Sequence, residues 1–266
     1  MSAPIAVTIA GSDSGGGAGI QADLKTFSAL GVYGASVITA LTAQNTLGVR
    51  AIHDAPPEFI AAQIDAVFSD LDVKAVKIGM LSRAATIEAV ASGIDRHGMA
   101  NVVLDPVMVA ASGDRLLAGD AVAALRKLLI PRALVITPNL PEAAALLDAQ
   151  PAKGEDEMQA QAQRLLRLGT KAVLIKGGHG EGVESVDLLV DAAGVLRLAA
   201  PRVATRNTHG TGCTLSSAIA AELAKGRALA DAVRAAKAYI TAAIKAADRL
   251  QIGKGRGPVH HFHQWW

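Results

Sequence analysis

The chain has 266 residues and a formal net charge of +2, with 51% hydrophobic residues and only 3% aromatic ones. This length favours one large α/β domain, and the aliphatic content suits helices packed on a buried parallel sheet. Lys and Arg are scattered and nearly balanced by Asp and Glu, which removes any electrostatic case for a nucleic-acid partner. The single cysteine excludes an internal disulfide and fits a reducing compartment. No apolar run is long enough to span a bilayer, so we expect a cytoplasmic protein without a membrane partner.

Strand and helix patterns alternate along the chain. Strands are expected at 5–10, 35–42, 73–81, 101–109, 134–137 and 172–176, with a short extended piece at 51–53. Helices are expected at 20–30, 58–68, 82–96, 117–129, 142–147, 156–168 and 229–249, and from Leu215 onward. Residues 185–203 have the pattern of a β-hairpin around the turn Ala192-Ala193-Gly194. The alternation predicts a single α/β domain over residues 1–266: a doubly wound, mostly parallel sheet with helices on both faces and the hairpin as an extension.

The loop over residues 11–19, GSDSGGGAG, follows the first expected strand. Gly17, Gly19 and Ala22 match a dinucleotide-binding fingerprint loosely, but no carboxylate stands about twenty residues further on to bind a ribose. The glycines allow the backbone to approach a small ligand closely, although a plain flexible turn would have the same composition.

A second glycine turn, Gly210-Thr211-Gly212, precedes Cys213 and the helix expected from Leu215. Unpaired N–H groups and the helix dipole make such a turn a suitable binding site for a phosphate or a developing oxyanion. The alternative is an ordinary helix cap provided by Thr211 or Thr214.

Polar or unusual residues gather where the expected strands end: Asp13, Gln44, Met80, Asp105, Asn139, Glu142 and Lys176. Each has an ordinary explanation when taken alone. Asp105 before Pro106 suits a turn, Asn139 suits a helix cap, and Lys176 suits a solvated strand end. Because ligands bind at the carboxyl ends of the strands in such sheets, their joint placement predicts one site.

The residue types indicate the chemistry of that site. Asp105, Asn139 and Glu142 offer oxygen ligands that suit Mg²⁺, and Lys176 offers a cation for phosphate oxygens. With the N–H donors of residues 210–213 they supply the positioning and charge neutralisation that phosphoryl transfer needs. No GxxxxGK[ST] motif occurs, which excludes a P-loop enzyme.

Several motifs together resemble one known family: GSDSGGGAGIQADLKTF, ITALTAQNT, KIGML, VLDPVM, TPNLPEA, KGGH and NTHGTGCTLSSAIA. They are similar to those of the hydroxymethylpyrimidine/phosphomethylpyrimidine kinases of thiamine biosynthesis, within the ribokinase-like superfamily. The resemblance runs from Ala6 to the tail and includes GPVHHF. It implies ATP-dependent phosphorylation of the hydroxymethyl group of 4-amino-5-hydroxymethyl-2-methylpyrimidine, followed by conversion of the monophosphate to the diphosphate.

The resemblance also implies roles for individual residues. Gln44 would hydrogen-bond the aminopyrimidine edge, in a pocket also lined by Gly11, Asp23, Met80 and Val107. The turn Gly210-Thr211-Gly212 would form the anion hole for the transferring phosphoryl group. The nucleotide, ATP, would lie against Lys176, Asn139, Thr211 and His209, and Mg²⁺ would be held by Asp105 and Glu142.

Cys213 stands where ribokinase-like enzymes commonly carry an aspartate that acts as the base. Since a thiol at a helix N-terminus has a lowered pKa, Cys213 is the candidate base; in the alternative it only packs against the substrate. His209 is a further candidate for the base, or else a loop residue beside the nucleotide.

Two other functions stay open. Pyridoxal kinase is a related activity, against which Gln44 and Cys213 favour the pyrimidine. A non-enzymatic ligand sensor could keep the pyrimidine pocket without Asp105, Glu142 or Lys176, all of which are present.

Two features of the chain remain without a place in the predicted site. The histidines at 260, 261 and 263 could bind a metal or simply pack, and Trp265 and Trp266 could bury against a neighbour. The family suggests a homodimer.

Overall fold

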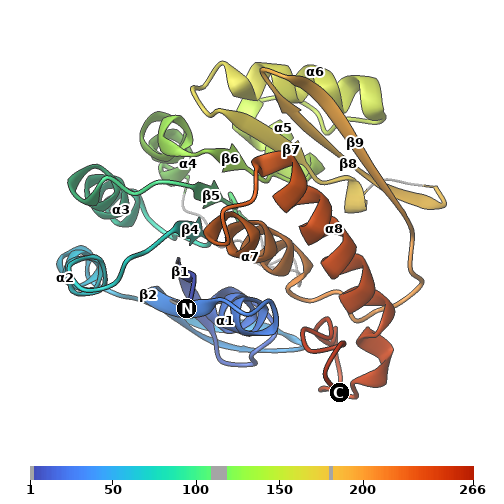
Figure 1. Ribbon diagram of the computed structural model, residues 1–266, viewed down its shortest axis with the longest axis horizontal. Coiled ribbons are helices and arrows are strands. Elements are labelled where there is room, and N and C mark those ends of the chain that lie inside the picture. Colours follow the sequence, from blue (N-terminus) through green and yellow to red (C-terminus); the bar gives the residue numbers. More distant parts are fainter. Residues whose placement is uncertain (1–2, 109–118, 180–181) are drawn as a thin grey trace.

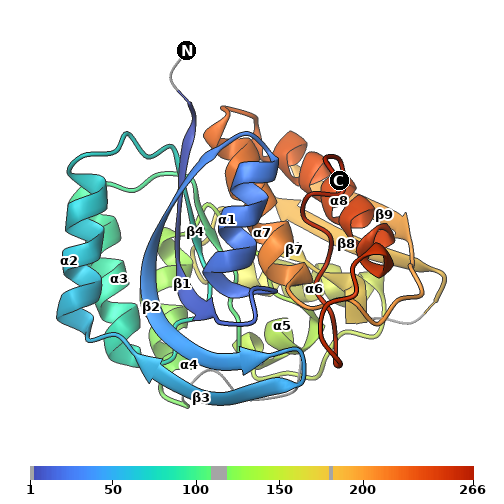
Figure 2. The same ribbon diagram turned by 90° about the horizontal axis from the view of Figure 1, so that it is seen from below.

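Nine strands form one sheet in the residues that the computed structural model describes, which are 3–108, 119–179 and 182–266. Their order across the sheet is β3-β2-β1-β4-β5-β6-β7-β8-β9 (Figure 1, Figure 2). The strands are β1 (Ile5–Asp13), β2 (Tyr33–Asn45), β3 (Gly48–Asp54), β4 (Ala75–Ile78), β5 (Val102–Leu104), β6 (Val135–Ile136), β7 (Ala172–Ile175), β8 (Glu184–Asp191) and β9 (Gly194–Pro201). β1, β2 and β4 to β7 run parallel, whereas the pairs β2–β3, β7–β8 and β8–β9 are antiparallel. The expected mostly parallel sheet with a hairpin extension is confirmed.

Helices cover both faces of this sheet (Figure 1). They are α1 (Gly19–Ala29), α2 (Pro57–Phe68), α3 (Ala84–His97), α4 (Ala121–Ala124), α5 (Leu140–Leu147), α6 (Glu155–Leu166), α7 (Thr211–Ala224) and α8 (Leu229–Lys245). One apolar core lies under α2 to α6, and a second lies under α1, α7 and α8. Strand β5 contributes side chains to both cores: Val102 and Leu104 belong to the first and Val103 to the second. This follows because successive side chains of a strand point to opposite faces of the sheet.

Several boundaries differ from those expected. β1 continues to Asp13 and β2 continues to Asn45, so Gln44 lies inside a strand instead of after one. The physical reason is the edge strand β3, whose antiparallel pairing with β2 extends the ladder beyond the parallel part. β4 and β5 are instead shorter than their apolar runs. Residues such as Met80 and Leu81 lie beyond the ladder but are still buried, so their apolar character does not mark the end of the strand.

The helices also depart from expectation in two places. The helix expected at 117–129 is α4 followed by a π-helical turn over Leu125–Leu129. Residues 117 and 118 of that expected helix lie outside the described residues, as does position 109 of the fourth expected strand. The last helix ends at Lys245, and a separate 3₁₀ turn spans Ala247–Arg249. Within the described ranges, no helix has the length and apolar character that a membrane span requires.

Candidate active site

The loop after β1 is organised by the side chain of Asp13. Its Oδ1 accepts the N–H of Gly15 at 2.8 Å, and its Oδ2 accepts those of Gly17 at 3.1 Å and Ala18 at 2.9 Å. Burial acts to raise the pKa of Asp13, but the interaction with His209 and these N–H donors outweigh it and hold the pKa below its usual range. Asp13 is therefore an ionised, buried acceptor around which the glycines fold.

His209 joins this loop to the second glycine turn. Its Nε2 lies 2.8 Å from Oδ2 of Asp13. Where the two loops touch, only glycine fits: a Cβ on Gly17 would strike the ring of His209, and a Cβ on Gly210 would strike the carbonyl oxygen of Gly17. Gly210 also has a φ of 78°, in the left-handed region that favours glycine. Two loops that are far apart in the sequence thus form one wall of the site.

Helix α7 begins at Thr211, not at Leu215 as expected, with Gly210 as its N-cap and no side chain capping it. The hydroxyl of Thr211 donates to the carbonyl oxygen of Thr208 at 2.7 Å, and that of Thr214 lies 3.0 Å from Nε2 of His261. The alternative of a cap provided by Thr211 or Thr214 is therefore wrong. The N–H groups of Thr211 and Thr214 donate to the carbonyl oxygens of Thr208 and Gly210, at 3.3 Å and 2.9 Å. The N–H groups of Gly212 and Cys213 are left to an external acceptor such as a phosphate.

Cys213 lies in this first turn and is partly exposed. Burial raises the pKa of its thiol to about 11; Asp23 and Asp105 act in the same direction, whereas the ammonium of Lys77 and a hydrogen bond with the backbone of Gly19 act against them. The lowered pKa expected from the position at a helix N-terminus is therefore wrong, because desolvation and two nearby carboxylates outweigh the favourable terminus. Cys213 is a neutral thiol at neutral pH.

Lys176 lies at the centre of a charged cluster at the end of β7. Its Nζ is 2.7 Å from Oδ1 of Asp105 and 3.8 Å from Oε2 of Glu142. The hydroxyl of Thr137 donates to the same Asp105 oxygen at 3.0 Å. Burial acts to raise the pKa of Asp105, but the charges of Lys176 and Lys77 and the hydrogen bonds from Lys176 and Thr137 together outweigh it and hold that pKa below its usual range. A Cβ on Gly212 would lie 3.3 Å from Nζ of Lys176, so the cluster adjoins the glycine turn.

Asn139 and Glu142 form a reciprocal cap at the start of α5. The Asn139 side chain accepts the N–H of Glu142, and the Glu142 side chain accepts the N–H of Asn139, both at 2.8 Å. The interpretation of Asn139 as a helix cap is confirmed. Burial raises the pKa of Glu142 to about 7, with Asp105 acting in the same direction and Lys176 against it.

The two carboxylates at Lys176 fit a magnesium site in part. Among the described residues, no group of three or more His, Cys, Asp or Glu side chains is placed to hold a metal ion by itself. Mg²⁺ typically takes only one or two carboxylates and completes its octahedron with waters and phosphate oxygens, which Asp105 and Glu142 would suit. The raised pKa of Glu142 marks a buried carboxylate that Lys176 alone does not neutralise.

A buried ion pair that the sequence did not reveal lies beneath the turn. Nζ of Lys77 is 2.9 Å and 2.8 Å from the two carboxylate oxygens of Asp23, and both side chains are 0% exposed. Thr8 and Ser217 donate to the same carboxylate at 2.6 Å each. The resemblance implied that Asp23 lines the pyrimidine pocket, whereas here its oxygens are engaged by this network. The available signal was a lysine inside the aliphatic run AVKI, since such a residue needs a buried partner.

Gln44 faces His209 beside a cavity. The Nε2 atoms of the two side chains are 3.5 Å apart. The cavity has a volume of about 230 Å³, and its lining includes Gln44, Asn45, Arg206 and His209. A second cavity of about 530 Å³ shares Arg206 with it. Of the sequence-predicted residues, Gln44 and His209 therefore meet at an open pocket.

The remaining residues expected around the pyrimidine lie at the ends of β1, β4 and β5. A Cβ on Gly11 would lie 3.2 Å from Sδ of Met80, so these two residues pack together. Met80 is buried, and Val107 is half-buried two residues after Asp105, whose carbonyl oxygen accepts its N–H at 2.8 Å.

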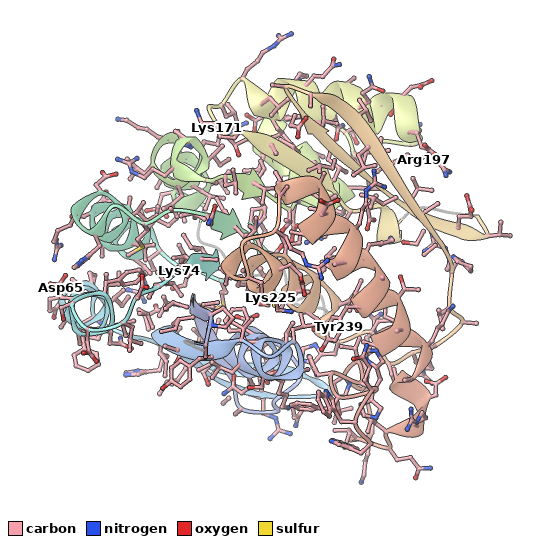
Figure 3. The ribbon with its side chains drawn as sticks, in the orientation of Figure 1. Asp65, Lys74, Lys171, Arg197, Lys225 and Tyr239 are labelled. Carbon is pink, nitrogen blue, oxygen red and sulfur yellow. The ribbon has the colours of Figure 1, made fainter. Side chains whose placement is uncertain are left out.

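The C-terminal tail contacts the site at two places, the turn after β2 and the loop before α7. The N–H of Gly255 donates to Oγ1 of Thr46 at 3.1 Å, and the N–H of His209 donates to the carbonyl oxygen of Gly257 at 3.0 Å. Further along, Tyr239 on α8 (Figure 3) donates its hydroxyl proton to the carbonyl oxygen of His261 at 2.7 Å. The tail therefore connects the turn after β2, the glycine turn and α8.

The tail histidines pack instead of gathering around a metal. His260 contacts the ring of Trp266, and His263 contacts that of Tyr239. They form no metal-holding group among the described residues. Trp265 and Trp266 are 68% and 65% exposed, so neither indole is buried by the chain itself.

Comparison with known proteins identifies a family and several relatives that this chain resembles over nearly its full length. The sequence pattern of a family described as phosphomethylpyrimidine kinase matches residues 13–260. The hydroxymethylpyrimidine/phosphomethylpyrimidine kinase of Rhizobium meliloti is 66% identical over 262 residues, which are 98% of each chain. The protein of the same name from Salmonella typhimurium is 58% identical over 261 residues, again 98% of each chain.

Solved structures show the same relationship. The ADP complex of Bacillus subtilis pyridoxal kinase has a TM-score of 0.91 at 40% identity, covering 99% of both chains. The phosphomethylpyrimidine kinase of Clostridium difficile has a TM-score of 0.81 at 47% identity, covering 91% of this chain and 99% of that one. With its ribokinase-like fold, this chain belongs to the phosphomethylpyrimidine kinase family.

Proposed function

We propose that this chain is an ATP-dependent kinase that phosphorylates 4-amino-5-hydroxymethyl-2-methylpyrimidine and then converts the monophosphate to the diphosphate, for thiamine biosynthesis in the cytoplasm. The observation that carries the proposal is the meeting of Lys176, Asp105 and the uncapped start of α7 at one edge of the sheet, in a chain of this family. A homodimer is the assembly that the family suggests, and light scattering of the purified protein tests it.

Phosphoryl transfer here depends on neutralising charge. Lys176 holds two carboxylates in the structure, and its ammonium would turn to phosphate oxygens when ATP binds. The N–H groups of the first turn of α7 would donate to the transferring phosphoryl group, where negative charge must be stabilised. Mg²⁺ held at Asp105 and Glu142 would supply further neutralisation of the phosphates.

The two steps differ in their need for a base. In the first step the substrate hydroxyl attacks the γ-phosphorus of ATP and must lose its proton, and Cys213 is the candidate acceptor. Because the pKa of its thiol is about 11 even with the charge of Lys77 beside it, only a small fraction of Cys213 would be ionised before the substrate binds. In the second step an oxygen of the substrate monophosphate attacks, and that oxygen is already ionised near neutral pH. The second step therefore needs no base.

Recognition of the ring distinguishes this function from pyridoxal phosphorylation. The Gln44 amide offers both a donor and an acceptor, which suits the amino group and adjacent ring nitrogen of an aminopyrimidine. A non-enzymatic sensor would have no use for Lys176 and Asp105 paired beside an uncapped helix start. Pyridoxal kinase remains the second candidate because a pyridoxal kinase superposes on this chain so closely.

The test is a steady-state ATP assay with the hydroxymethylpyrimidine, its monophosphate and pyridoxal, each supplied separately. We expect turnover of both pyrimidines, with kcat/KM for the hydroxymethylpyrimidine exceeding that for pyridoxal. A large preference for pyridoxal would overturn the proposed substrate, and absence of ATP turnover with intact pyrimidine binding would favour a sensor.

A further inference from the structure

Polar side chains surround the amide of Gln44 on two sides. On one side, Oγ1 of Thr42 lies 3.1 Å from Oε1 of Gln44 and 2.9 Å from the carbonyl oxygen of Ser12. On the other side, Nε2 of His209 lies 3.5 Å from Nε2 of Gln44 and 2.8 Å from Oδ2 of Asp13. Asp13, Thr42 and His209 are 3%, 8% and 8% exposed, so their polar atoms depend on one another for partners.

The proton on His209 follows from the state of Asp13. Oδ2 of Asp13 accepts N–H groups from Gly17 and Ala18, and its pKa lies below the usual range, so the carboxylate can only accept. An acceptor 2.8 Å from Nε2 of His209 requires a proton on that nitrogen. That proton is directed at Asp13, so Nε2 of His209 has no lone pair to accept a hydrogen bond from Gln44. An NH₂ group of Gln44 at 3.5 Å would face another donor, whereas the amide oxygen would face an N–H group.

The proton on Thr42 leads to the same conclusion from the opposite side. A hydroxyl has one proton, and the carbonyl oxygen of Ser12 can only accept, so that proton goes to Ser12. What Thr42 offers to Gln44 is a lone pair, which needs a donor. A half-turn of the terminal amide exchanges its oxygen and nitrogen with little change in shape, and it satisfies both neighbours at once.

We propose that Asp13, His209 and Thr42 hold the Gln44 amide with its oxygen toward His209 and its nitrogen toward Thr42, and so determine which ring the pocket accepts. The inference rests on the proposed function. A fixed amide meets the donor and acceptor of an aminopyrimidine in one order only. A ring with another order leaves buried polar groups unpaired, which is the strongest form of discrimination that hydrogen bonds provide. Thr42 and His209 act through Gln44 and are therefore positioning residues.

Two matched pairs of variants test the proposal. Thr42→Val removes the hydroxyl at nearly constant shape, and Thr42→Ser keeps it. His209→Leu removes the N–H, and His209→Gln places an amide donor near the former Nε2. The readout is the ratio of kcat/KM for the hydroxymethylpyrimidine to kcat/KM for pyridoxal, with the KM for ATP and the thermal midpoint as controls.

We expect the ratio to fall about fivefold or more in Thr42→Val and His209→Leu, mainly through the KM of the pyrimidine. In Thr42→Ser and His209→Gln it should stay within about twofold of the unaltered protein. A merely structural role would lower the thermal midpoint and affect both rings alike. An unchanged ratio in the Val and Leu variants, or an equal fall in all four variants, would overturn the proposal.

Nitrogen NMR of the labelled imidazole provides a readout that needs neither turnover nor a variant. We expect Nε2 of His209 to carry a proton at neutral pH, and a bare Nε2 would refute the assigned amide orientation. Failure of the proposed function is recognised separately, as absence of pyrimidine turnover by the unaltered protein. In that case the NMR measurement still tests the proton on Nε2 that the assigned orientation requires.

Discussion

Glu142 should make the folded protein less stable as the pH rises from about 4.5 to about 7. Burial raises the pKa of this carboxyl from 4.5 to about 7. At roughly 1.4 kcal/mol per pKa unit this rise corresponds to about 3 kcal/mol. Because the folded state holds the proton more tightly, the stabilisation is complete below the unfolded pKa and is lost as the pH rises through the folded one.

The substitution Glu142→Gln isolates this effect. A glutamine keeps the shape of the side chain and an oxygen that accepts the N–H of Asn139, but it cannot ionise. Urea unfolding of both proteins, without Mg²⁺, should be followed from about pH 4.5 to about pH 8. The free energy of unfolding of the variant relative to the parent should increase by about 3 kcal/mol across that range. Glu88→Gln, at an exposed position on α3, is the matched control and should show no such trend.

Parallel pH profiles for Glu142→Gln and its parent would refute the reasoning. They would mean that Lys176, 3.8 Å away, fully offsets the cost of burial and that Glu142 is already ionised in the folded state. The same argument predicts that the apparent affinity for Mg²⁺ rises with pH through about 7 in the parent, because only the ionised carboxylate binds the metal.

Three further predictions concern the region around the glycine turn. Cys213→Ser should lower kcat of the first phosphorylation by about 100-fold and leave the second nearly unchanged; assays with each substrate decide, and equal losses would remove Cys213 as the base. Gly210→Ala should destabilise the protein more than Gly226→Ala in thermal unfolding. The two glycines have similar φ values, 78° and 85°, but the added Cβ meets a backbone carbonyl at the first site and nothing within 4 Å at the second. The Gly226 change should cost about 1–2 kcal/mol, and similar losses at both sites would contradict the close approach of the loops. Lys77→Met should cost about 3–5 kcal/mol in urea unfolding by leaving the carboxylate of Asp23 buried without its cation, and Lys77→Met/Asp23→Leu should recover much of it; a loss below about 1 kcal/mol in the single variant would show that the pair is not structural.

The architecture was predictable because hydrophobic period and element length are local properties. The helices and the hairpin follow from the spacing of apolar residues along the chain. Because ligand-binding residues gather at the carboxyl ends of parallel strands, Lys176 and Asp105 were expected to lie close together, and they do. Boundaries were less predictable where a distant partner extends or ends an element. β2 continues to Asn45 because β3 pairs with it, and α7 begins at Thr211 because Gly210 adopts a left-handed conformation.

The electrostatics of the site could not be predicted from sequence position. A helix N-terminus suggested a lowered pKa for Cys213, but the pKa depends on how deeply the thiol is buried and on carboxylates contributed by other elements. Likewise, nothing local to Asp13 indicates that its partner is His209, which lies 196 residues later. Such pairs are visible only once the chain is folded.

The tail contacts bear on the order in which the protein forms during synthesis. Gly255 bonds to Thr46, 209 residues earlier in the chain, and the carbonyl oxygen of Gly257 holds the N–H of His209. A ribosome delivers the chain from its N-terminus, so a nascent protein can pair its strands long before these partners emerge. A chain stalled short of residue 255 should therefore have a folded sheet but lack these tail contacts. Because Gly255 and Arg256 also line the cavity beside Gln44, we expect substrate binding only after the tail has left the exit tunnel.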